Sequence, residues 1–522
     1  MKNPDTSNCH RFIAETEADA IVERIKAGLL LRNGGQPPVF SDLIKTEGGQ
    51  TYQYANYVQE GGGVLGVGLI GYTYVLEKLG IRFVKLAGTS AGAINTMMLA
   101  VVDKKNYTEK EKELGNPFTC QSELILQEML DFDLWNLVDG APVAKKILKR
   151  ILKNKTYIKK TLNVLKWLVI VALGALLLLG IGMSFSGLHP SGWAGGRWHA
   201  FKILAWVGFG GVMALAVLAL WVRYYLGRFV KAGYGINPGT AFYNWMKDIL
   251  QRNGIENTAD LEQRMAARSQ GLSLSPARLA QAIKDDNAQI DPPYLSIIAS
   301  DITNQTKVEF PRMTSVYWPD NPHLVHPADF VRASMSIPVF FEPFTVRVPP
   351  QRNSVISKTV FKTIDEQVGN TGALDVRFVD GGILSNFPIN LFHNNKVEVA
   401  RLPTFGCKLE DETHIDPAKA LPAKKTFFSF LGDVFTTVRF YYDREFLMKH
   451  EVYQQLIGHV DVEKFNWLNF SIGYEEQKAL FTQGARAAET FFLGGEIWVD
   501  GKKQQFDAYD WERFKKDRLN IV

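Results

Sequence analysis

The stretch QEGGGVLGVGLIGYTYVLEKLGIRFVKLAGTSAGAIN, residues 59–95, decides the fold. Residues 54–58, just before it, alternate in polarity and are rich in aromatic side chains, which predicts a strand. Apolar residues at helical spacing predict a helix over 67–79, residues 81–86 predict a second strand, and another helix can begin directly after Ser90. This alternation predicts an α/β fold with a mainly parallel central sheet and right-handed crossovers.

Ser90 stands in Gly88-Thr-Ser-Ala-Gly92, which fits the G-x-S-x-G pattern of a sharp strand-to-helix turn that exposes a serine. The flanking glycines, Gly88 and Gly92, are needed because side chains would clash across such a turn. Ser90 would also lie at a helix N-terminus, where the helix dipole stabilises developing negative charge. The pattern also occurs by chance, so on its own it leaves Ser90 either a nucleophile or a packing residue.

A glycine loop precedes this turn by one strand, so both would emerge at the carboxyl ends of neighbouring strands. Its residues Gly61, Gly62 and Gly63 form a predicted oxyanion hole, in which the N–H groups of Gly62 and Gly63 could converge on an oxyanion. Gly61, Gly63 and Gly66 also match the spacing of a dinucleotide-binding loop. A loop and a serine on consecutive strands fit acyl transfer better than dinucleotide binding.

A nucleophilic serine needs a base, and a second glycine-rich segment offers one. In RFVDGGILSNFPIN, residues 377–390, the first three residues suit a strand that ends in Asp380, and Gly381 and Gly382 turn the chain at once. An ordinary Asp-Gly turn is the alternative interpretation. The histidines are less convincing, because each is better interpreted as a surface residue or a satisfied core residue: His323, His326, His393, His414, His450 and His459.

These residues together resemble the patatin-like phospholipase family. Glu60 to Gly66 is similar to the family's oxyanion loop, Gly88 to Gly92 to its nucleophile elbow, and Asp380-Gly381-Gly382 to its catalytic aspartate motif. Residues 332–338, RASMSIP, are similar to a further segment that the family shares. The resemblance covers roughly residues 55–400, interrupted by an insert, and the order of the motifs makes it specific.

The resemblance implies a three-layer patatin-like α/β fold and a Ser-Asp dyad without histidine, in which Ser90 is the nucleophile and Asp380 the general base. It implies a lipid acyl hydrolase that cleaves fatty-acyl esters of phospholipid or lysophospholipid, with no metal ion and no cofactor. A free aspartate has a pKa of about 3.9, so the dyad needs an apolar, water-poor pocket to raise its basicity. Leu65 stands where most members have Arg or Lys, so a charge that could aid the oxyanion or the headgroup is missing.

Two other functions stay open at this point. One is a non-catalytic or weakly catalytic membrane protein that binds lipid, because the changed residue at position 65 could have weakened catalysis. The other is a thioesterase or an acyltransferase that uses the same dyad. The oligomeric state is unknown from the sequence.

The net charge of +5 hides an uneven distribution. Residues 140–247 contain 15 Lys and Arg and no Asp or Glu, whereas the rest of the chain has 44 basic and 54 acidic residues. Within this segment, residues 167–185 and 203–222 are uncharged runs of 19 and 20 residues. Each is long enough to cross a bilayer as a helix, and the short, turn-rich loop between them predicts a transmembrane hairpin. A buried hairpin in a large soluble core is the alternative.

Basic residues flank this hairpin on one side. Arg223, Arg228 and Lys231 follow the second run, whereas the connecting loop has only Arg197 and Lys202. The positive-inside rule therefore predicts a two-pass integral membrane protein with both termini and the catalytic domain on the cytoplasmic side. Eight residues before the first run are expected to lie on anionic headgroups rather than on nucleic acid: Lys145, Lys146, Lys149, Arg150, Lys153, Lys155, Lys159 and Lys160.

Four parts follow from these patterns. They are an N-terminal helical extension (1–53), a catalytic domain in two pieces (54–139 and 233–400), a basic segment with the hairpin (140–232), and a C-terminal part that completes the catalytic domain (401–522). In the first part, residues 15–31 suit a helix. In the last part, the aromatic cluster FNWLNF near residue 465 is expected to be core rather than a binding platform. Three widely spaced cysteines, Cys9, Cys120 and Cys407, suit a reducing compartment.

Overall fold

The structure is a computed structural model of the chain. It describes residues 8–140, 145, 163, 170, 174, 196–276, 278, 292–349, 374–394, 401–410, 437, 440–499 and 502–519. The chain divides into two compact units: one consists of Met1–Asp139 and Gly239–Val522, and the other of Gly140–Pro238. The segment 140–232, expected to be an insert, lies within the second unit.

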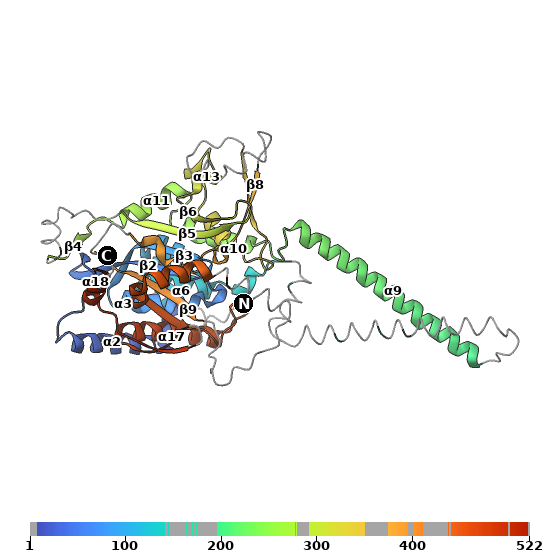
Figure 1. Ribbon diagram of the computed structural model, residues 1–522, viewed down its shortest axis with the longest axis horizontal. Coiled ribbons are helices and arrows are strands. Elements are labelled where there is room, and N and C mark those ends of the chain that lie inside the picture. Colours follow the sequence, from blue (N-terminus) through green and yellow to red (C-terminus); the bar gives the residue numbers. More distant parts are fainter. Residues whose placement is uncertain are drawn as a thin grey trace. The chain divides into compact units, whose positions relative to one another are not determined.

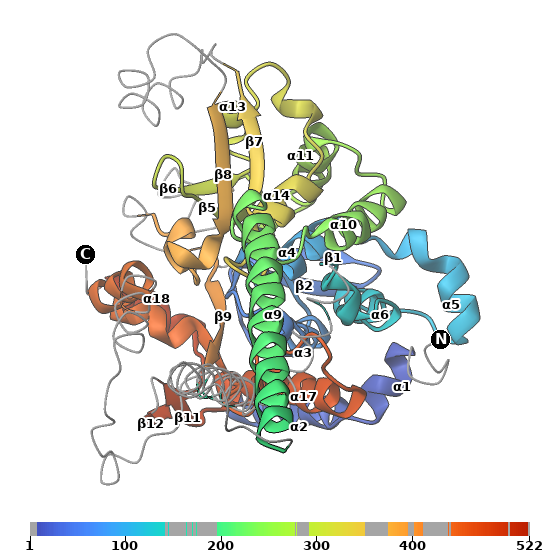
Figure 2. The ribbon, with the colours of Figure 1, turned by 90° about the vertical axis from the view of Figure 1, so that its right-hand side faces the viewer.

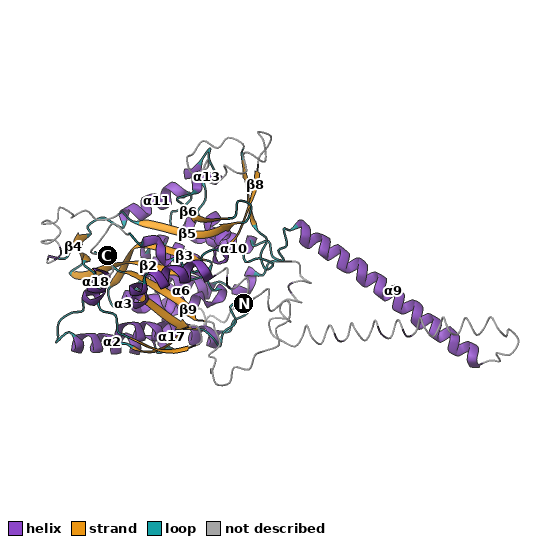
Figure 3. Ribbon diagram, in the orientation of Figure 1, coloured by secondary structure: helices purple, strands orange, loops and turns teal. Residues whose placement is uncertain are grey.

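A large mixed sheet organises the first unit, with helices packed around it (Figures 1 and 3). Five neighbouring strands in its middle, in the order β10-β9-β2-β3-β5, are parallel, as expected. Antiparallel strands join these five: β8 and then β7 extend the sheet beyond β5, β6 also pairs with β5, and β1 pairs with β2 and β4. The strands are β1 Leu43–Glu47, β2 Gln50–Gln59, β3 Ile81–Thr89, β4 Ser273–Leu274, β5 Tyr294–Asp301, β6 Thr306–Phe310, β7 Phe344–Val348, β8 Leu374–Asp380, β9 Thr404–Glu410 and β10 Ile457–Asp461.

The register of this sheet brings two distant strand ends to one level. Thr89, the last residue of β3, pairs with Ile298 of β5. Asp380, the last residue of β8, pairs with the next residue of β5, Ala299. Because β8 runs antiparallel to β5, the last residues of β8 lie beside the part of β5 that pairs with the end of β3. Figure 2 shows β8 beside its other neighbour, β7. Ser90 therefore follows β3 at the level that β8 reaches with Asp380.

Helices connect these strands and cover the sheet. The helix α3, between β2 and β3, packs against α17, and α4, which follows β3, packs against β3 and β2. Figure 1 shows α2 and α17 lying side by side. The α-helices whose bounds the structure describes in this unit are α1 Cys9–Ala14, α2 Ala18–Arg32, α3 Gly66–Lys78, α4 Ala91–Val101, α5 Thr108–Leu114, α6 Gln121–Asp131, α10 Thr240–Arg252, α11 Thr258–Ala267, α13 Thr314–Tyr317, α14 Ala328–Ser334, α17 Tyr474–Leu493 and α18 Trp511–Leu519. A hairpin of β11 Gly495–Val499 and β12 Lys502–Phe506 follows α17.

The helix expected over 15–31 is present as α2, which begins three residues later than expected, and a short helix, α1, precedes it. The chain forms α1, breaks after Ala14, and starts α2 at Ala18. The break is local, because the Thr16 hydroxyl donates to the Ile13 carbonyl at 2.7 Å and accepts the Ala18 N–H at 3.3 Å. Residues 1–53 are also not purely helical, since β1 and the start of β2 belong to the central sheet.

The first unit is interrupted between Asp139 and Gly239, and these two chain ends lie together. The Asp139 carboxylate accepts the N–H of Gly239 at 3.0 Å and the N–H of Ala241 at 2.9 Å. These bonds satisfy backbone donors at the start of α10, which a helix leaves without partners of its own. The Asp139 side chain therefore holds the two chain ends of the interruption together.

The second unit contains one long helix, α9, which spans Gly196–Lys231. Among the described residues, a single helix is long and apolar enough to cross a membrane, and it covers Phe209–Lys231. The helix α9 begins inside the loop expected over 186–202 and continues past residue 222, where the second apolar run was expected to end. The first run, 167–185, lies outside the described residues except for two positions, so the hairpin remains a prediction.

Candidate active site

Ser90 occupies a strained turn between β3 and α4. Its backbone has φ 53° and ψ −118°, a conformation that residues other than glycine rarely adopt. Such strain persists only where the surrounding structure holds it, and it is commonly found at functional sites. The turn packs closely against the end of β2, because a Cβ on Gly92 would lie 2.7 Å from the carbonyl oxygen of Glu60. Ser90 itself is only 4% exposed and begins α4, so the positive end of that helix dipole lies at the serine.

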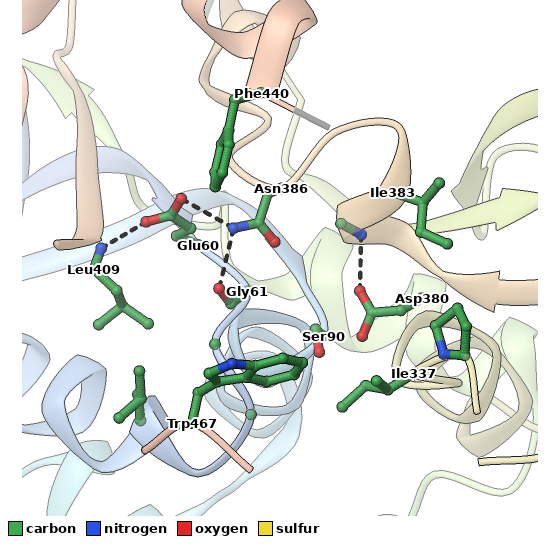
Figure 4. Close-up of a pocket in the computed structure, with 15 residues that line it drawn as sticks. Glu60, Gly61, Ser90, Ile337, Asp380, Ile383, Asn386, Leu409, Phe440 and Trp467 are labelled. Atoms are coloured by element: carbon green, nitrogen blue, oxygen red, sulfur yellow. Dashed lines mark hydrogen bonds between the residues drawn. The ribbon is translucent and has the colours of Figure 1, made fainter. Parts of the chain in front are cut away.

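Asp380 faces Ser90 across a cavity. It ends β8, and the chain turns at once into a short 3-10 segment, Gly381–Ile383. The Asp380 Oδ1 atom accepts the N–H of Gly382 at 2.8 Å, which holds the carboxylate in one orientation. Figure 4 shows its second oxygen directed towards Ser90. The residue is 8% exposed.

The segment 332–336 holds both residues by hydrogen bonds. The Ser90 N–H donates to the Ser334 hydroxyl at 2.9 Å, and the Asp380 N–H donates to the Ser336 carbonyl at 2.9 Å. Arg332 is buried and donates to the Ser336 hydroxyl, and burial lowers the pKa of its guanidinium to about 10. The sequence marked this segment only by resemblance, whereas the structure shows that it positions the serine and the aspartate relative to each other.

The glycine loop provides two amides rather than three. The Gly61 N–H donates to the Asn386 carbonyl at 3.1 Å, so it is not available to an oxyanion. Gly63 has φ +56° and packs on the Trp467 carbonyl, to which Val64 donates its N–H at 3.0 Å. Within the described residues, no hydrogen bond engages the N–H groups of Gly62 and Gly63. These two glycines are therefore the candidate oxyanion donors.

A buried carboxylate anchors the start of this loop. Glu60 accepts the Leu409 N–H on Oε2 at 2.6 Å and the Asn386 side-chain N–H on Oε1 at 3.0 Å. The same Asn386 nitrogen donates to the Gly61 carbonyl at 3.1 Å. Figure 4 shows these three hydrogen bonds beside the cavity. They join the loop that follows β2 to the chain that follows Asp380.

Asp443, in the helical residues 440–449, holds that second chain segment from the other side. Its carboxylate accepts the Ser385 hydroxyl and the Phe387 N–H, each at 2.8 Å. These are the two residues that flank Asn386. Burial raises the pKa of the Asp443 carboxyl to about 6, although both donors and the nearby Lys307 favour its ionised form.

The cavity between these groups has a volume of about 870 Å³, including its opening to solvent. Its polar side chains are Glu60, Ser90, Asp380 and Asn386, and the rest of its wall is apolar or glycine: Gly61, Gly62, Gly63, Leu65, Ile337, Pro338, Gly382, Ile383, Leu409, Phe440 and Trp467. Leu65, the residue that departs from the family pattern, is buried in this wall. An apolar cavity with a few convergent polar groups is the usual form of a binding site for an apolar substrate.

Three wall residues come from the C-terminal part of the chain and were missed by the sequence analysis. Leu409 is the penultimate residue of β9, Phe440 belongs to the helical residues 440–449, and Trp467 lies in the aromatic cluster near residue 465. The expectation that this cluster is core is correct for Phe470, which is buried and stacks on Phe340 with 4.7 Å between the ring centroids. It is wrong for Trp467, and no local pattern distinguishes the two.

Histidine contributes nothing to the wall of this cavity as far as the chain is described. His326 lies outside this wall, and burial lowers its pKa to about 4. His459 also lies outside it and forms a hydrogen bond with Glu410 at 2.7 Å. His414 lies outside the described residues. No group of three or more His, Cys, Asp or Glu that could hold a metal ion occurs in the described part of the chain, and its three cysteines are buried and unpaired.

The basic residues expected on the membrane surface belong to the second unit. Lys145 is helical and partly buried, and the other seven lie outside the described residues. Their interaction with headgroups therefore remains a prediction.

Comparison with known proteins gives a family match that includes the glycine loop, the Ser90 turn and the Asp380 turn. A family model described as patatin-like phospholipase matches residues 58–393. The uncharacterized protein YqhO of Bacillus subtilis (strain 168) is 25% identical over 438 residues, which cover 84% of this chain and 98% of that protein. The crystal structure of VipD from Legionella pneumophila is similar with a TM-score of 0.33 and 16% identity, over 90% of this chain and 72% of that chain.

Proposed function

Because the chain belongs to the patatin-like phospholipase family, we propose that it is a membrane-anchored lipid acyl hydrolase that uses Ser90 and Asp380 as a catalytic dyad. The observation that carries the proposal is the shared cavity. It places a serine in a strained turn opposite a buried aspartate and beside the amides of Gly62 and Gly63. Nucleophile, base and oxyanion donors are the three groups that acyl transfer requires.

The reaction would proceed in two steps. Asp380 takes the proton of Ser90 as Oγ attacks the ester carbonyl, and the Gly62 and Gly63 N–H groups stabilise the oxyanion together with the start of α4. The tetrahedral intermediate collapses, the alcohol leaves with the proton from Asp380, and the acyl group stays on Ser90. Water then cleaves this acyl-enzyme, which releases the fatty acid.

The substrate we propose is a fatty-acyl ester of phospholipid or lysophospholipid. Ile337, Ile383, Leu409, Phe440 and Trp467 give the cavity a wall that suits an acyl chain. An acyl chain in the cavity would exclude water from the dyad, and desolvation makes a carboxylate a stronger base.

The membrane anchor we propose is α9, paired with the first apolar run of the sequence. None of the described side chains in its window Phe209–Lys231 is buried, and large apolar residues such as Trp206, Phe209 and Leu220 are exposed. A continuous apolar surface of this length would be costly in water and is favourable in a bilayer. Anchoring would raise the concentration of lipid that the cavity meets.

The dyad is tested with purified full-length protein in detergent. Wild type should release fatty acid from phosphatidylcholine or lysophosphatidylcholine micelles and react with a fluorophosphonate probe. Ser90→Ala should lose both, and Asp380→Asn should lose fatty-acid release, whereas the exposed controls Ser273→Ala and Asp320→Asn should keep wild-type rates. Full fatty-acid release by Ser90→Ala or Asp380→Asn would refute the dyad.

The same assay separates the alternatives. Lipid binding without probe labelling or fatty-acid release would indicate a non-catalytic lipid-binding protein. Labelling of Ser90 with release only from thioesters, or with transfer of the acyl group to an alcohol, would indicate a thioesterase or an acyltransferase.

A further inference from the structure

The Asn386 side chain has one orientation that its neighbours permit. Its nitrogen donates to the Gly61 carbonyl oxygen and to Glu60 Oε1. A carbonyl oxygen can only accept, so the amide nitrogen must lie on this side and the amide oxygen on the other. Figure 4 shows that oxygen turned to the side on which Ser90 and Asp380 lie.

The oxygen of this amide is a buried acceptor without a protein donor. Asn386 is 3% exposed, and within the described residues Oδ1 has no hydrogen-bond partner. Buried polar atoms usually have a partner, because an unpaired one loses its bonds to water without compensation. An exception that lines a cavity is a candidate for binding something that enters that cavity.

Two glycines show where this acceptor lies. A Cβ on Gly61 would be 2.6 Å from Asn386 Oδ1 and 3.1 Å from the Ser90 Cβ. A Cβ on Gly382 would lie within 3.0 Å of both Asn386 Oδ1 and Asp380 Oδ1. Any larger residue at either position would crowd Asn386 Oδ1, and the space at Gly382 is bordered by both acceptors.

We propose that Asn386 Oδ1 and Asp380 together hold the water that hydrolyses the acyl-enzyme. The inference rests on the proposed function, because it requires an acyl group on Ser90. A water molecule has two protons, and the two acceptors take one hydrogen bond each. Its oxygen is then directed by two fixed contacts instead of one, which is the geometric requirement for an efficient attack.

The water oxygen attacks the carbonyl carbon of acyl-Ser90, and one water proton passes to Asp380. The other proton keeps its hydrogen bond to Asn386 Oδ1 and remains in the acid that forms. As the tetrahedral intermediate collapses, the bond between carbon and Ser90 Oγ breaks and the proton on Asp380 returns to Oγ. Acylation uses no water, so Asn386 Oδ1 acts on deacylation alone.

This difference between the two half-reactions provides the test. In stopped-flow assays with a p-nitrophenyl ester, Asn386→Ala should give a burst near one p-nitrophenol per active site, followed by turnover about tenfold or more below wild type. Intact-mass measurement should show the acyl group retained on the protein. The rate of fluorophosphonate labelling reports the acylation step.

Glu60→Gln is the matched control, since it changes the partner of the Asn386 nitrogen and leaves Oδ1 in place. It should alter acylation and deacylation in proportion and accumulate no acyl-enzyme. A second variant, Gly382→Ala, leaves Asn386 itself unchanged and puts a methyl group into the space between the two acceptors, so it should reproduce the accumulation. It also covers the case in which Asn386→Ala fails to label because its loop is disturbed.

The outcomes are distinct. Accumulated acyl-enzyme in Asn386→Ala or Gly382→Ala, without accumulation in Glu60→Gln, supports the proposal. Equal slowing of labelling and turnover in both variants, with no trapped acyl group, overturns it. Absence of labelling and turnover in wild type would instead refute the proposed function.

Discussion

Replacing Asp443 by asparagine should change the pH dependence of stability by a calculable amount. The pKa of this buried carboxyl is raised from 3.8 to about 6, so the folded protein favours its neutral form. The stability that this preference contributes is fully present below pH 3.8 and is lost as the pH rises through 6. A shift of this size corresponds to about 3 kcal/mol. Asparagine does not ionise, and it can accept the Phe387 N–H with its oxygen while donating to the Ser385 hydroxyl.

The assay compares Asp443→Asn with wild type in guanidinium unfolding, followed by tryptophan fluorescence in detergent. Between pH 4 and pH 7.5 the stability of the variant relative to wild type should rise by about 2.4 kcal/mol, because at pH 4 the carboxyl of the unfolded chain is already partly ionised. The intrinsic effect of the substitution and the titration of all other groups cancel in this difference. Asp320→Asn, at an exposed aspartate, should show no such change. An equal difference at the two pH values would refute the assigned burial of the Asp443 charge.

Three further predictions concern the cavity and the anchor. Gly63→Ala should reduce fatty-acid release by about 10²–10³-fold, because a Cβ on this positive-φ residue would meet the Trp467 carbonyl and move a candidate oxyanion donor. The control Gly48→Ala, also at positive φ but with open space around it, should leave the rate unchanged. Ser334→Ala should slow fluorophosphonate labelling of Ser90 by roughly 5–100-fold, because the buried Ser90 N–H loses its acceptor, and an unchanged labelling rate would contradict this role. Leu220→Asp should release the protein from membranes during alkaline carbonate extraction, because an aspartate in the middle of a spanning helix raises the free energy of insertion by about 2.5–3.5 kcal/mol. The control Lys231→Asp, at the end of the helix, should leave the protein bound.

The candidate catalytic elements could be located from the sequence because their turns are local. A glycine loop, a G-x-S-x-G turn and an Asp-Gly-Gly turn each follow a strand, and the structure places all three on one cavity. The parallel centre of the sheet followed from the alternation of strands and helices in residues 54–101. These features depend on backbone turns, which require particular residues at particular spacings.

The remaining features depend on contacts that no local pattern records. The antiparallel direction of β8 brings Asp380 level with Ser90, and it follows from pairing with β5 rather than from residues 377–390. Trp467 lines the cavity while Phe470, three residues later, is core. Asp443 supports the loop around Asn386 from more than fifty residues away. Such roles are decided by tertiary packing, so an aromatic cluster or a lone aspartate has no signature of its own.

The hydrogen bonds of Asp139 have a consequence for how the intervening segment can be removed. Because this side chain already joins the two edges of the interruption, the parent fold does not depend on the intervening residues to bring Asp139 to Gly239. A segment such as the proposed anchor can therefore occupy this site without redesign of the surrounding core. In the laboratory, the reverse operation, joining Asp139 to Gly239 through a few glycines and serines, should yield a water-soluble enzyme for crystallisation.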